Sequence, residues 1–248
     1  MADFYNGGHA ADGPLVVLIH GAGSNHTVWR YQTRLLANRG YRVMAFDLPG
    51  HGSNPEPALR SVEGMAAWVA DRIPKPGTII GHSLGGLISL ELARTRPELV
   101  ERLGLFGCRS QMSVTPELQR RADAFDLAAV ALIVGWSYSG HLGAHPEPGV
   151  SPAGVTARLL ESELTNLGGD LAACSAYQLG SEAAGELKVP TLVVAGGHDR
   201  MAALAGVVEM AESIHDARLV VIPYGGHFMI TDSPDAVRKA LSTFLASP

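Results

Sequence analysis

The sequence predicts an α/β fold in which a mostly parallel, doubly wound sheet carries an inserted helical cap. Short β-branched runs alternate with longer helical patterns, as expected when a parallel sheet has helices on both faces. One long segment, residues 108–187, interrupts this alternation with helical patterns but no strand. The composition, 46% hydrophobic and 17% charged over 248 residues, is that of a globular protein able to bury a full core.

Six runs are predicted to be the strands of this sheet. The first, LVVLIH at 15–20, is apolar and is bounded by Gly-Pro before it and Gly after it. This pattern is typical of a strand that is buried on both faces. The other predicted strands are 41–49, 77–83, 100–107, 191–197 and 217–223.

Helical patterns separate these strands. The last helix is the best marked, because Ser233 can cap it, Pro234 suits its first position and Asp235 favours the positive end of the helix dipole. The other predicted helices of the core are 33–38, 62–73, 84–94 and 202–214.

The segment 108–187 is predicted to be the cap, and residues 1–107 and 188–248 the α/β core. Two helical patterns, 117–136 and 155–167, flank a stretch at 138–154 that holds four Gly and three Pro. So long a loop is unusual unless it is a lid or a binding loop. We expect the cap to set specificity and this loop to be mobile and to gate entry, the alternative being a rigid loop remote from the pocket.

Composition and charge argue against several classes of protein. The net charge of −5 leaves no basic surplus for phosphates, and no polybasic run exists, so neither nucleic acid nor a membrane surface is expected as a partner. The chain shows no secretory signal and no bilayer-spanning run, and its two cysteines are too few for a disulfide framework. We expect free thiols in a cytoplasmic protein. Without an H-E-x-x-H pair or a G-x-G-x-x-G run, no metal and no cofactor are expected.

The most informative motif is GHSLG at 81–85, a G-x-S-x-G sequence. A predicted strand precedes it and a predicted helix follows it, and a serine on such a sharp strand-to-helix turn is held clear of the sheet. The glycines are needed because the turn leaves no room for side chains, and Gly86 can serve close packing of the helix. Ser83 is therefore the predicted nucleophile.

The loop HGAGSN at 20–25 follows the first predicted strand. Its small residues let the backbone approach a bound carbonyl group. The backbone N–H groups of Ala22 and Leu84, the residue after Ser83, are the predicted oxyanion donors. His20 is interpreted as a brace for this loop, with a tentative place in the substrate pocket as the alternative.

A serine hydroxyl needs a neighbouring base to become a good nucleophile. His227, in PYGGHF, directly follows the last predicted strand, and Asp199, in AGGHD, follows the strand before it. Open α/β sheets place their sites at such carboxyl ends of strands. We predict that His227 is the base and that Asp199 holds its imidazole in the right tautomer.

Other residues are weaker candidates for these roles. His198 neighbours Asp199 but points elsewhere if Asp199 faces the site, and Asp47 belongs to a turn after its strand. His141 and His145 lie in the cap loop, where solvated or substrate-facing positions are more usual. His51 and His82 are turn residues without the placement of a base.

The motifs HGAGSN, DLPGHGSN, GHSLGG, GGHD and GGHF occur in an order and spacing that closely resemble the α/β-hydrolase family, over nearly the whole core. The resemblance implies an eight-stranded, mostly parallel sheet, a helical cap after the sixth strand, and hydrolysis of an ester, thioester, amide or related bond without a cofactor. The sequence departs from the family in two places. The opening antiparallel strands must be short or missing, and the acid motif, GGHDRMAA, lacks the prolines that often follow the acid.

Together these features predict a serine hydrolase that cleaves a small, fairly apolar carboxylic ester through an acyl-enzyme. Trp136 and Tyr177 of the cap are tentative pocket residues, with burial in the cap interior as the alternative. A C–C bond hydrolase, a thioesterase or a lyase would use the same triad, because fold and triad do not fix the bond. A small-molecule receptor with residual activity is a further alternative. The sequence leaves the oligomeric state open.

Overall fold

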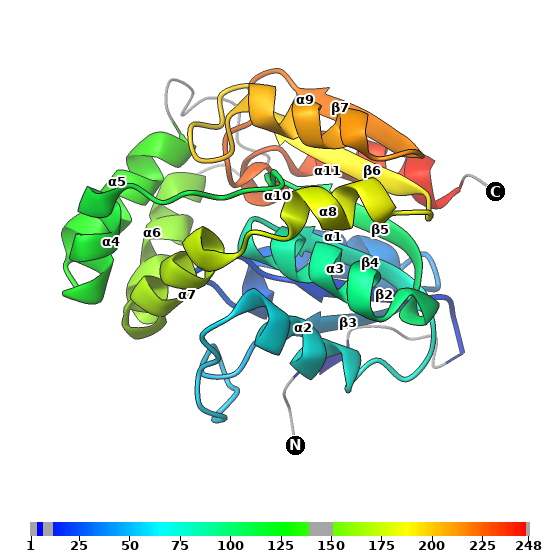
Figure 1. The fold of residues 1–248 in the computed structure, drawn as a ribbon, viewed down its shortest axis with the longest axis horizontal. Helices are drawn as coiled ribbons and strands as arrows, with labels where there is room; N and C mark the ends of the chain where they lie inside the picture. The colour runs from blue at the N-terminus through cyan, green and yellow to red at the C-terminus, as the bar shows by residue number, and fades with distance from the viewer. Residues whose placement is uncertain (1–3, 7–11, 139–150, 247–248) are drawn as a thin grey trace.

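The computed structural model describes residues 4–6, 12–138 and 151–246 (Figure 1). Within them, seven strands form one sheet in the order β1-β3-β2-β4-β5-β6-β7. All neighbours pair in parallel except β1 and β3, which are antiparallel. The strands are β1 (Phe4–Asn6), β2 (Leu15–Ile19), β3 (Arg42–Phe46), β4 (Gly77–His82), β5 (Val100–Phe106), β6 (Thr191–Gly196) and β7 (Ala217–Ile222).

This sheet confirms the predicted fold class, and each of the six predicted strands is present. The short β1 agrees with the expectation that the opening antiparallel strands are short or missing. Every residue of β2, β4 and β6 is buried, as their continuous apolar sequences predicted.

Two hydrophobic cores lie on opposite faces of the sheet, because successive side chains of a strand point to opposite sides. In β2, Val17 and Ile19 face one core, whereas Val16 and Leu18 face the other. The first core contains α2 (Val62–Ala70), α3 (Leu84–Thr95), α8 (Gly180–Glu186) and α9 (Leu204–Ser213). The second contains α1 (Arg30–Ala37), α10 (Met229–Asp232) and α11 (Pro234–Leu245).

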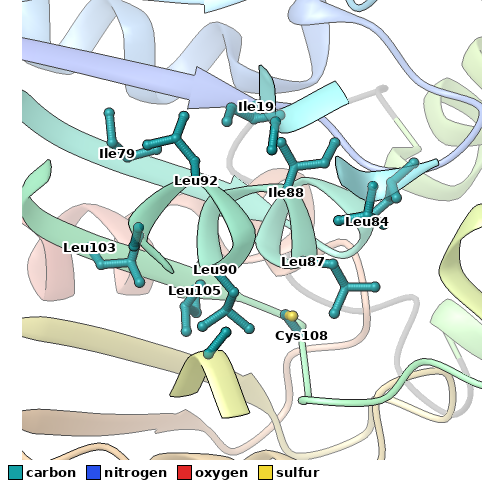
Figure 2. Close-up of a cluster of buried hydrophobic side chains, with 14 of the residues drawn as sticks. Ile19, Ile79, Leu84, Leu87, Ile88, Leu90, Leu92, Leu103, Leu105 and Cys108 are labelled. Atoms are coloured by element: carbon teal, nitrogen blue, oxygen red, sulfur yellow. The ribbon is translucent and has the colours of Figure 1, made fainter. Parts of the chain in front are cut away.

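Helix α3 is central to the first core. Figure 2 shows Leu84 and Ile88 on the same side of this helix as Ile19 of β2, while Leu105 of β5 lies near Leu90. All of these side chains are fully buried. Because α3 begins directly after Ser83, its packing fixes the position of that residue against the sheet.

The segment between β5 and β6 contains helices without a strand among its described residues, as predicted. Helices α4 (Pro116–Asp123), α5 (Leu127–Ser137), α6 (Pro152–Ser162) and α7 (Leu164–Ala176) pack on one another beside the sheet (Figure 1). Helix α8, by contrast, packs on α3 and α9 in the layer that covers the sheet. The division into a core and a cap at 108–187 stays a prediction, and most of the loop predicted to be mobile lies outside the described residues.

Three helix predictions need correction. The pattern at 117–136 is two helices, because the chain turns at Phe125, whose φ is +54°, and Asp126 caps α5 with its carboxylate. The pattern at 155–167 is likewise divided at Glu163. Ser233 precedes α11 but makes no side-chain cap, and its N–H instead donates to the carbonyl of Met229. Among the described helices, none is long and apolar enough to cross a membrane.

Candidate active site

Ser83 lies at the tightest point of the turn between β4 and α3. Its backbone has φ +55° and ψ −118°, a conformation that is strained for a residue with a side chain. A Cβ on Gly81 would collide with the backbone of Gly85, and one on Gly85 would lie 2.6 Å from the carbonyl oxygen of His20. Glycine is therefore required on both sides of Ser83.

The next glycine of the motif serves packing between helix and sheet. A Cβ on Gly86 would lie 2.5 Å from Cβ of Cys108, the residue that follows the turn after β5. This agrees with the predicted role of Gly86. Both cysteines, Cys108 and Cys174, are free and buried, and burial raises the pKa of Cys108 to about 12.

The structure brings Ser83, His227 and Asp199 together in one chain of hydrogen bonds. His227 Nε2 lies 3.0 Å from Ser83 Oγ, and Nδ1 lies 2.8 Å from Asp199 Oδ2. A carboxylate can only accept, so Nδ1 carries the proton and Nε2 presents its lone pair to the Ser83 hydroxyl. This is the arrangement in which a serine proton can pass to a histidine.

Backbone groups fix the carboxylate of Asp199. Its second oxygen, Oδ1, accepts hydrogen bonds from the N–H groups of Met201 and Ala202, both at 2.8 Å. These bonds leave Oδ2 directed at His227. The turn after β6 therefore needs no proline after the acid, because the backbone amides at 201 and 202 hold the side chain.

The loop after β7 carries His227 back over the strand ends. Its N–H donates to the carbonyl of Ser137 at the end of α5, and its carbonyl accepts a hydrogen bond of 2.8 Å from Nε2 of His82. The preceding N–H, of Gly226, donates to Asp232 Oδ2 at 3.0 Å. Burial and the nearby His227 lower the pKa of His82 to about 3, so His82 is a neutral neighbour of the nucleophile.

The predicted oxyanion donors lie on two sides of Ser83. A Cβ on Gly21 would lie 3.1 Å from Cβ of Ser83, which shows how closely the loop before Ala22 approaches the nucleophile. Leu84 is the first residue of α3, where backbone N–H groups have no helical partner. Within the described residues, neither the Ala22 nor the Leu84 N–H has a hydrogen-bond partner, so both are open to a ligand.

A cavity of about 90 Å³ opens beside Ser83 and His227. Residues of the segment between β5 and β6 line it together with loops at the strand ends, and most of its wall is apolar. Trp136, a predicted pocket residue, is part of that wall. The lining is Gly21, Ala22, His82, Ser83, Met112, Ser113, Val114, Thr115, Leu118, Ile133, Trp136, Leu171, Cys174, Arg200, Met201, His227 and Phe228.

Two predicted pocket residues do not line this cavity. Tyr177 is buried against α3, where its hydroxyl donates to Glu91 at 2.9 Å. His20 is fully buried under the oxyanion loop, where Nε2 accepts from the N–H of Leu48 and Nδ1 donates to the carbonyl of Gly21. Its position agrees with the other interpretation of His20, as a brace for the loop.

The rival residues lie elsewhere. Asp47 is bound by His26 and Ser53, and His51 is buried against Asp170. His198 packs near Tyr224 rather than in the cavity, and His141 and His145 lie outside the described residues.

Sequence reasoning missed several residues around the site. The chain at 112–115 lines the cavity, yet it has no motif and no regular structure that could have marked it. Asp170 of α7 was also missed. Its partner His51 belongs to DLPGHGSN, but no local pattern joins that turn to a helix more than a hundred residues later.

Comparisons with known proteins agree with this geometry. The model of the alpha/beta hydrolase family matches residues 16–240. Over 244 residues, 94% of each chain, the sequence is 30% identical to the pimeloyl-[acyl-carrier protein] methyl ester esterase of Chromobacterium violaceum. It is 28% identical to the putative carbamate hydrolase RutD of Pseudomonas savastanoi, with 95% of each chain covered. The crystal structure of the enol-lactonase from Burkholderia xenovorans superposes with a TM-score of 0.87 at 23% identity, covering 98% of this chain and 96% of that one.

The chain therefore belongs to the alpha/beta hydrolase family. It is a hydrolase, and the relatives named for their chemistry include esterases.

Proposed function

We propose that this hydrolase is a serine esterase that cleaves small, fairly apolar carboxylic esters through an acyl-enzyme. The observation that carries the proposal is the hydrogen-bonded chain from Ser83 through His227 to Asp199, which ends at an apolar cavity. A cavity of about 90 Å³ is small beside the roughly 300–1,000 Å³ of typical ligand pockets, and it favours a short acyl or alcohol group.

The geometry supports the following sequence of steps. Ser83 Oγ attacks the carbonyl carbon of the ester while its proton passes to His227 Nε2. The negative charge on the former carbonyl oxygen is stabilised by the N–H groups of Ala22 and Leu84. The intermediate collapses, the alcohol leaves with the proton from His227, and the acyl group stays on Ser83.

The second half of the reaction repeats these roles with water. His227 takes a proton from the water, whose oxygen attacks the acyl carbon. The new tetrahedral intermediate expels Ser83 Oγ, which recovers its proton from His227, and the carboxylic acid is released. The carboxylate of Asp199 accepts the hydrogen bond from His227 Nδ1 and stabilises the imidazolium that forms in each half.

An ester is the proposed bond because the relative from Chromobacterium violaceum is named for a methyl ester substrate. The apolar wall made by Ile133, Trp136 and Phe228 gains most from an apolar group and offers little to a charged one. We infer that Trp136 contacts the substrate.

Ser83→Ala tests the proposal. The variant should stay folded and lose activity on p-nitrophenyl esters by up to roughly a millionfold, because among the described residues Ser83 supplies the hydroxyl that is hydrogen-bonded to His227 Nε2. A fluorophosphonate should label the wild type at Ser83, as peptide mass spectrometry would show. Ser213→Ala, an exposed serine at the end of α9, is the matched control and should keep full activity.

The chain length of the ester is the second variable. Acetate and butyrate esters should exceed longer acyl esters in kcat/KM, because the cavity is small.

A Ser83→Ala variant that kept more than a tenth of wild-type activity would contradict the assignment of the nucleophile. A matched thioester cleaved far better than the ester would move the proposal to thioester hydrolysis.

A further inference from the structure

The oxyanion loop packs tightly against helix α7. Gly23 has φ +58°, and a Cβ there would lie 2.8 Å from Cδ1 of Leu167. The N–H of Gly23 donates to Asp170 Oδ2 at 2.8 Å. Asp170 lies on α7 and is 1% exposed, so a buried carboxylate from another part of the chain holds the residue next to Ala22.

The same oxygen of Asp170 binds His51. His51 Nε2 lies 2.9 Å from Asp170 Oδ2, and Nδ1 lies 3.1 Å from the carbonyl oxygen of Pro49. Both partners can only accept, and a neutral imidazole has one N–H. The geometry therefore favours the imidazolium form, in which both nitrogens donate.

The charges around His51 agree with this form. Burial alone lowers the pKa of His51, but the hydrogen bond and charge of Asp170, the carbonyl of Pro49 and the charge of Glu163 outweigh it and raise the pKa. His20 packs beside His51, with ring centroids 5.0 Å apart, and the guanidinium of Arg60 packs against Gly169, the residue before Asp170. Burial and the charge of His51 lower the pKa of His20 to about 4, while Asp170 and Asp47 partly oppose this shift, so His20 stays neutral.

The oxyanion loop is thus held on both sides of Ala22. His20 donates to the carbonyl of Gly21 on one side, and Asp170 accepts from the N–H of Gly23 on the other. Glu163 adds two hydrogen bonds, because its Oε1 accepts from the side chain of Asn25 and from the N–H of Gly52, both at 2.9 Å. Two titratable side chains from the helices beyond β5 therefore fix the loop that carries one predicted donor.

We propose that Asp170, paired with the imidazolium of His51, is a positioning residue that holds the oxyanion loop in place and so couples the seating of α7 to transition-state stabilisation. The inference rests on the proposed function, because it assigns Ala22 to the oxyanion. The pair has no net charge. His51 cancels the charge of Asp170 and prevents it from repelling the oxyanion that forms nearby.

The pairing predicts a particular kinetic signature. The oxyanion exists only in the transition state and the intermediates, so a displaced loop lowers kcat and leaves KM nearly unchanged. Loss of a whole oxyanion donor costs roughly 10²–10³-fold. Displacement in Asp170→Ala should cost less, roughly 10–100-fold in kcat. Asp170→Asn keeps an acceptor for Gly23 but not the charge, and should lose less.

The pH profile separates positioning from mere structural support. Loss of the His51 proton at high pH removes one of the two N–H donors, so wild-type kcat should fall on the alkaline side as His51 titrates. Asp170→Asn removes the charge that raises the pKa of His51, and this alkaline fall should move to lower pH or disappear. The neighbours Glu163, His20 and Asp47 are the same in both proteins, so the comparison isolates Asp170.

The experiment measures kcat, KM and their pH profiles on p-nitrophenyl acetate for the wild type, Asp170→Ala and Asp170→Asn. Glu161→Gln, which removes one exposed carboxylate from α6, is the matched control for charge and should match the wild type. Inhibition by an alkyl trifluoromethyl ketone, which forms a tetrahedral oxyanion on Ser83, is compared with binding of the matching methyl ketone. Circular dichroism reports the fold.

The expected result is a lower kcat at unchanged KM. Inhibition by the trifluoromethyl ketone should weaken while binding of the methyl ketone does not change, and the alkaline side of the pH profile of kcat should be altered. If Asp170→Ala fails to fold, Asp170→Asn alone supplies the inhibition and pH comparison. The inference would be overturned if Asp170→Asn had the same kcat, the same ketone inhibition and the same pH profile as the wild type. It would also be overturned if the variant lost affinity equally for the trifluoromethyl ketone and the methyl ketone. A wild type that hydrolyses no ester and resists the fluorophosphonate would instead overturn the proposed function, and this inference with it.

Discussion

The nucleophile and the oxyanion loop follow adjacent strands, β4 and β2, yet they are held by different kinds of interaction. Backbone groups fix Ser83: its N–H donates to Phe106 of β5, and its carbonyl accepts from Gly86 and Leu87 in the first turn of α3. Side chains fix the oxyanion loop, through His20 on one side and Asp170 on the other.

Because of this difference, the positions of Ser83 and Ala22 depend on different properties of the protein. The position of Ser83 depends on glycines and on the packing of α3, which do not titrate. The position of Ala22 depends on a buried ion pair that joins α7 to the turn after β3. We infer that changes in the helices beyond β5 or in pH reach the reaction through the oxyanion loop rather than through the nucleophile.

After Ser83→Ala, the largest effect on activity is expected at Asp199, the side chain on which the backbone-held nucleophile depends through His227. In Asp199→Asn, the amide oxygen can still accept from the N–H groups of Met201 and Ala202, which leaves the NH₂ group facing His227 Nδ1. The histidine then carries its proton on Nε2 and cannot accept the serine proton. We expect kcat on p-nitrophenyl acetate to fall roughly 10³–10⁴-fold with the fold intact.

Asp216→Asn is the control for this change, because Asp216 is exposed just before β7. It should keep wild-type kcat and melting temperature. A kcat within tenfold of wild type in Asp199→Asn would show that the orientation of His227 does not depend on Asp199.

The second test breaks the backbone around Ser83. Gly85→Ala places a Cβ against the carbonyl of Ile19 and 2.6 Å from that of His20, so the elbow must shift from β2. Overpacking of this kind costs about 1–3 kcal/mol or more. We expect a lower melting temperature and reduced labelling of Ser83 by the fluorophosphonate.

Gly185→Ala is the matched glycine control. Gly185 lies in α8, and in the described part of the chain no atom beyond its own helix turn and chain neighbours would come within 4 Å of the added Cβ. Alanine favours a helix over glycine by roughly 0.5–1 kcal/mol, so this variant should be at least as stable as the wild type. An equal loss of stability in both variants would contradict the close-approach argument for the elbow.

The comparison also explains what could be predicted from the sequence. The fold, Ser83 and its two partners follow from local signals, since each comes after an apolar run that forms a strand, and β4 and β6 are buried throughout. Glycine requirements at the elbow are likewise local, because they arise from the backbone of a few consecutive residues. Parallel strands then bring these ends to one edge without further information.

Contacts between distant side chains could not be predicted in this way. Asp170 meets His51, 119 residues away, only because α7 packs over the loops after β2 and β3. Tyr177 was a tentative pocket residue because it is an apolar residue of the predicted cap, but its hydroxyl donates to Glu91 on α3. The break at Phe125 was missed because the sequences on both sides of it continue the helical pattern.

The loop that carries His227 is held in both ways, by backbone hydrogen bonds, like the turn at Ser83, and by a buried carboxylate, like the oxyanion loop. Asp232 Oδ2 accepts from the N–H of Gly226, while among the described residues Oδ1 has no hydrogen-bond partner. Burial, with the nearby charge of Asp199, raises the pKa of Asp232, although Ser233, Gly226 and His227 oppose this shift. A raised carboxyl pKa means that the folded protein binds this proton more tightly than the unfolded chain does.

Asp232→Asn is therefore expected to give the smallest effect, and one whose size depends on pH. The contribution of the protonated carboxyl is complete below the unfolded pKa, near 3.8, and is lost as pH rises through the higher folded pKa. Asparagine keeps an acceptor for Gly226 and never ionises. Its melting temperature should match the wild type at low pH and exceed it at pH 8, with kcat little changed. The control Asp235→Asn, at an exposed surface pair with Arg238, should shift stability by no more than about 1 kcal/mol, with no change in sign between pH 6 and pH 8. A melting temperature for Asp232→Asn below that of the wild type at pH 8 would mean that the charge itself stabilises the His227 loop, and the loop would then belong with the side-chain-held half of the site.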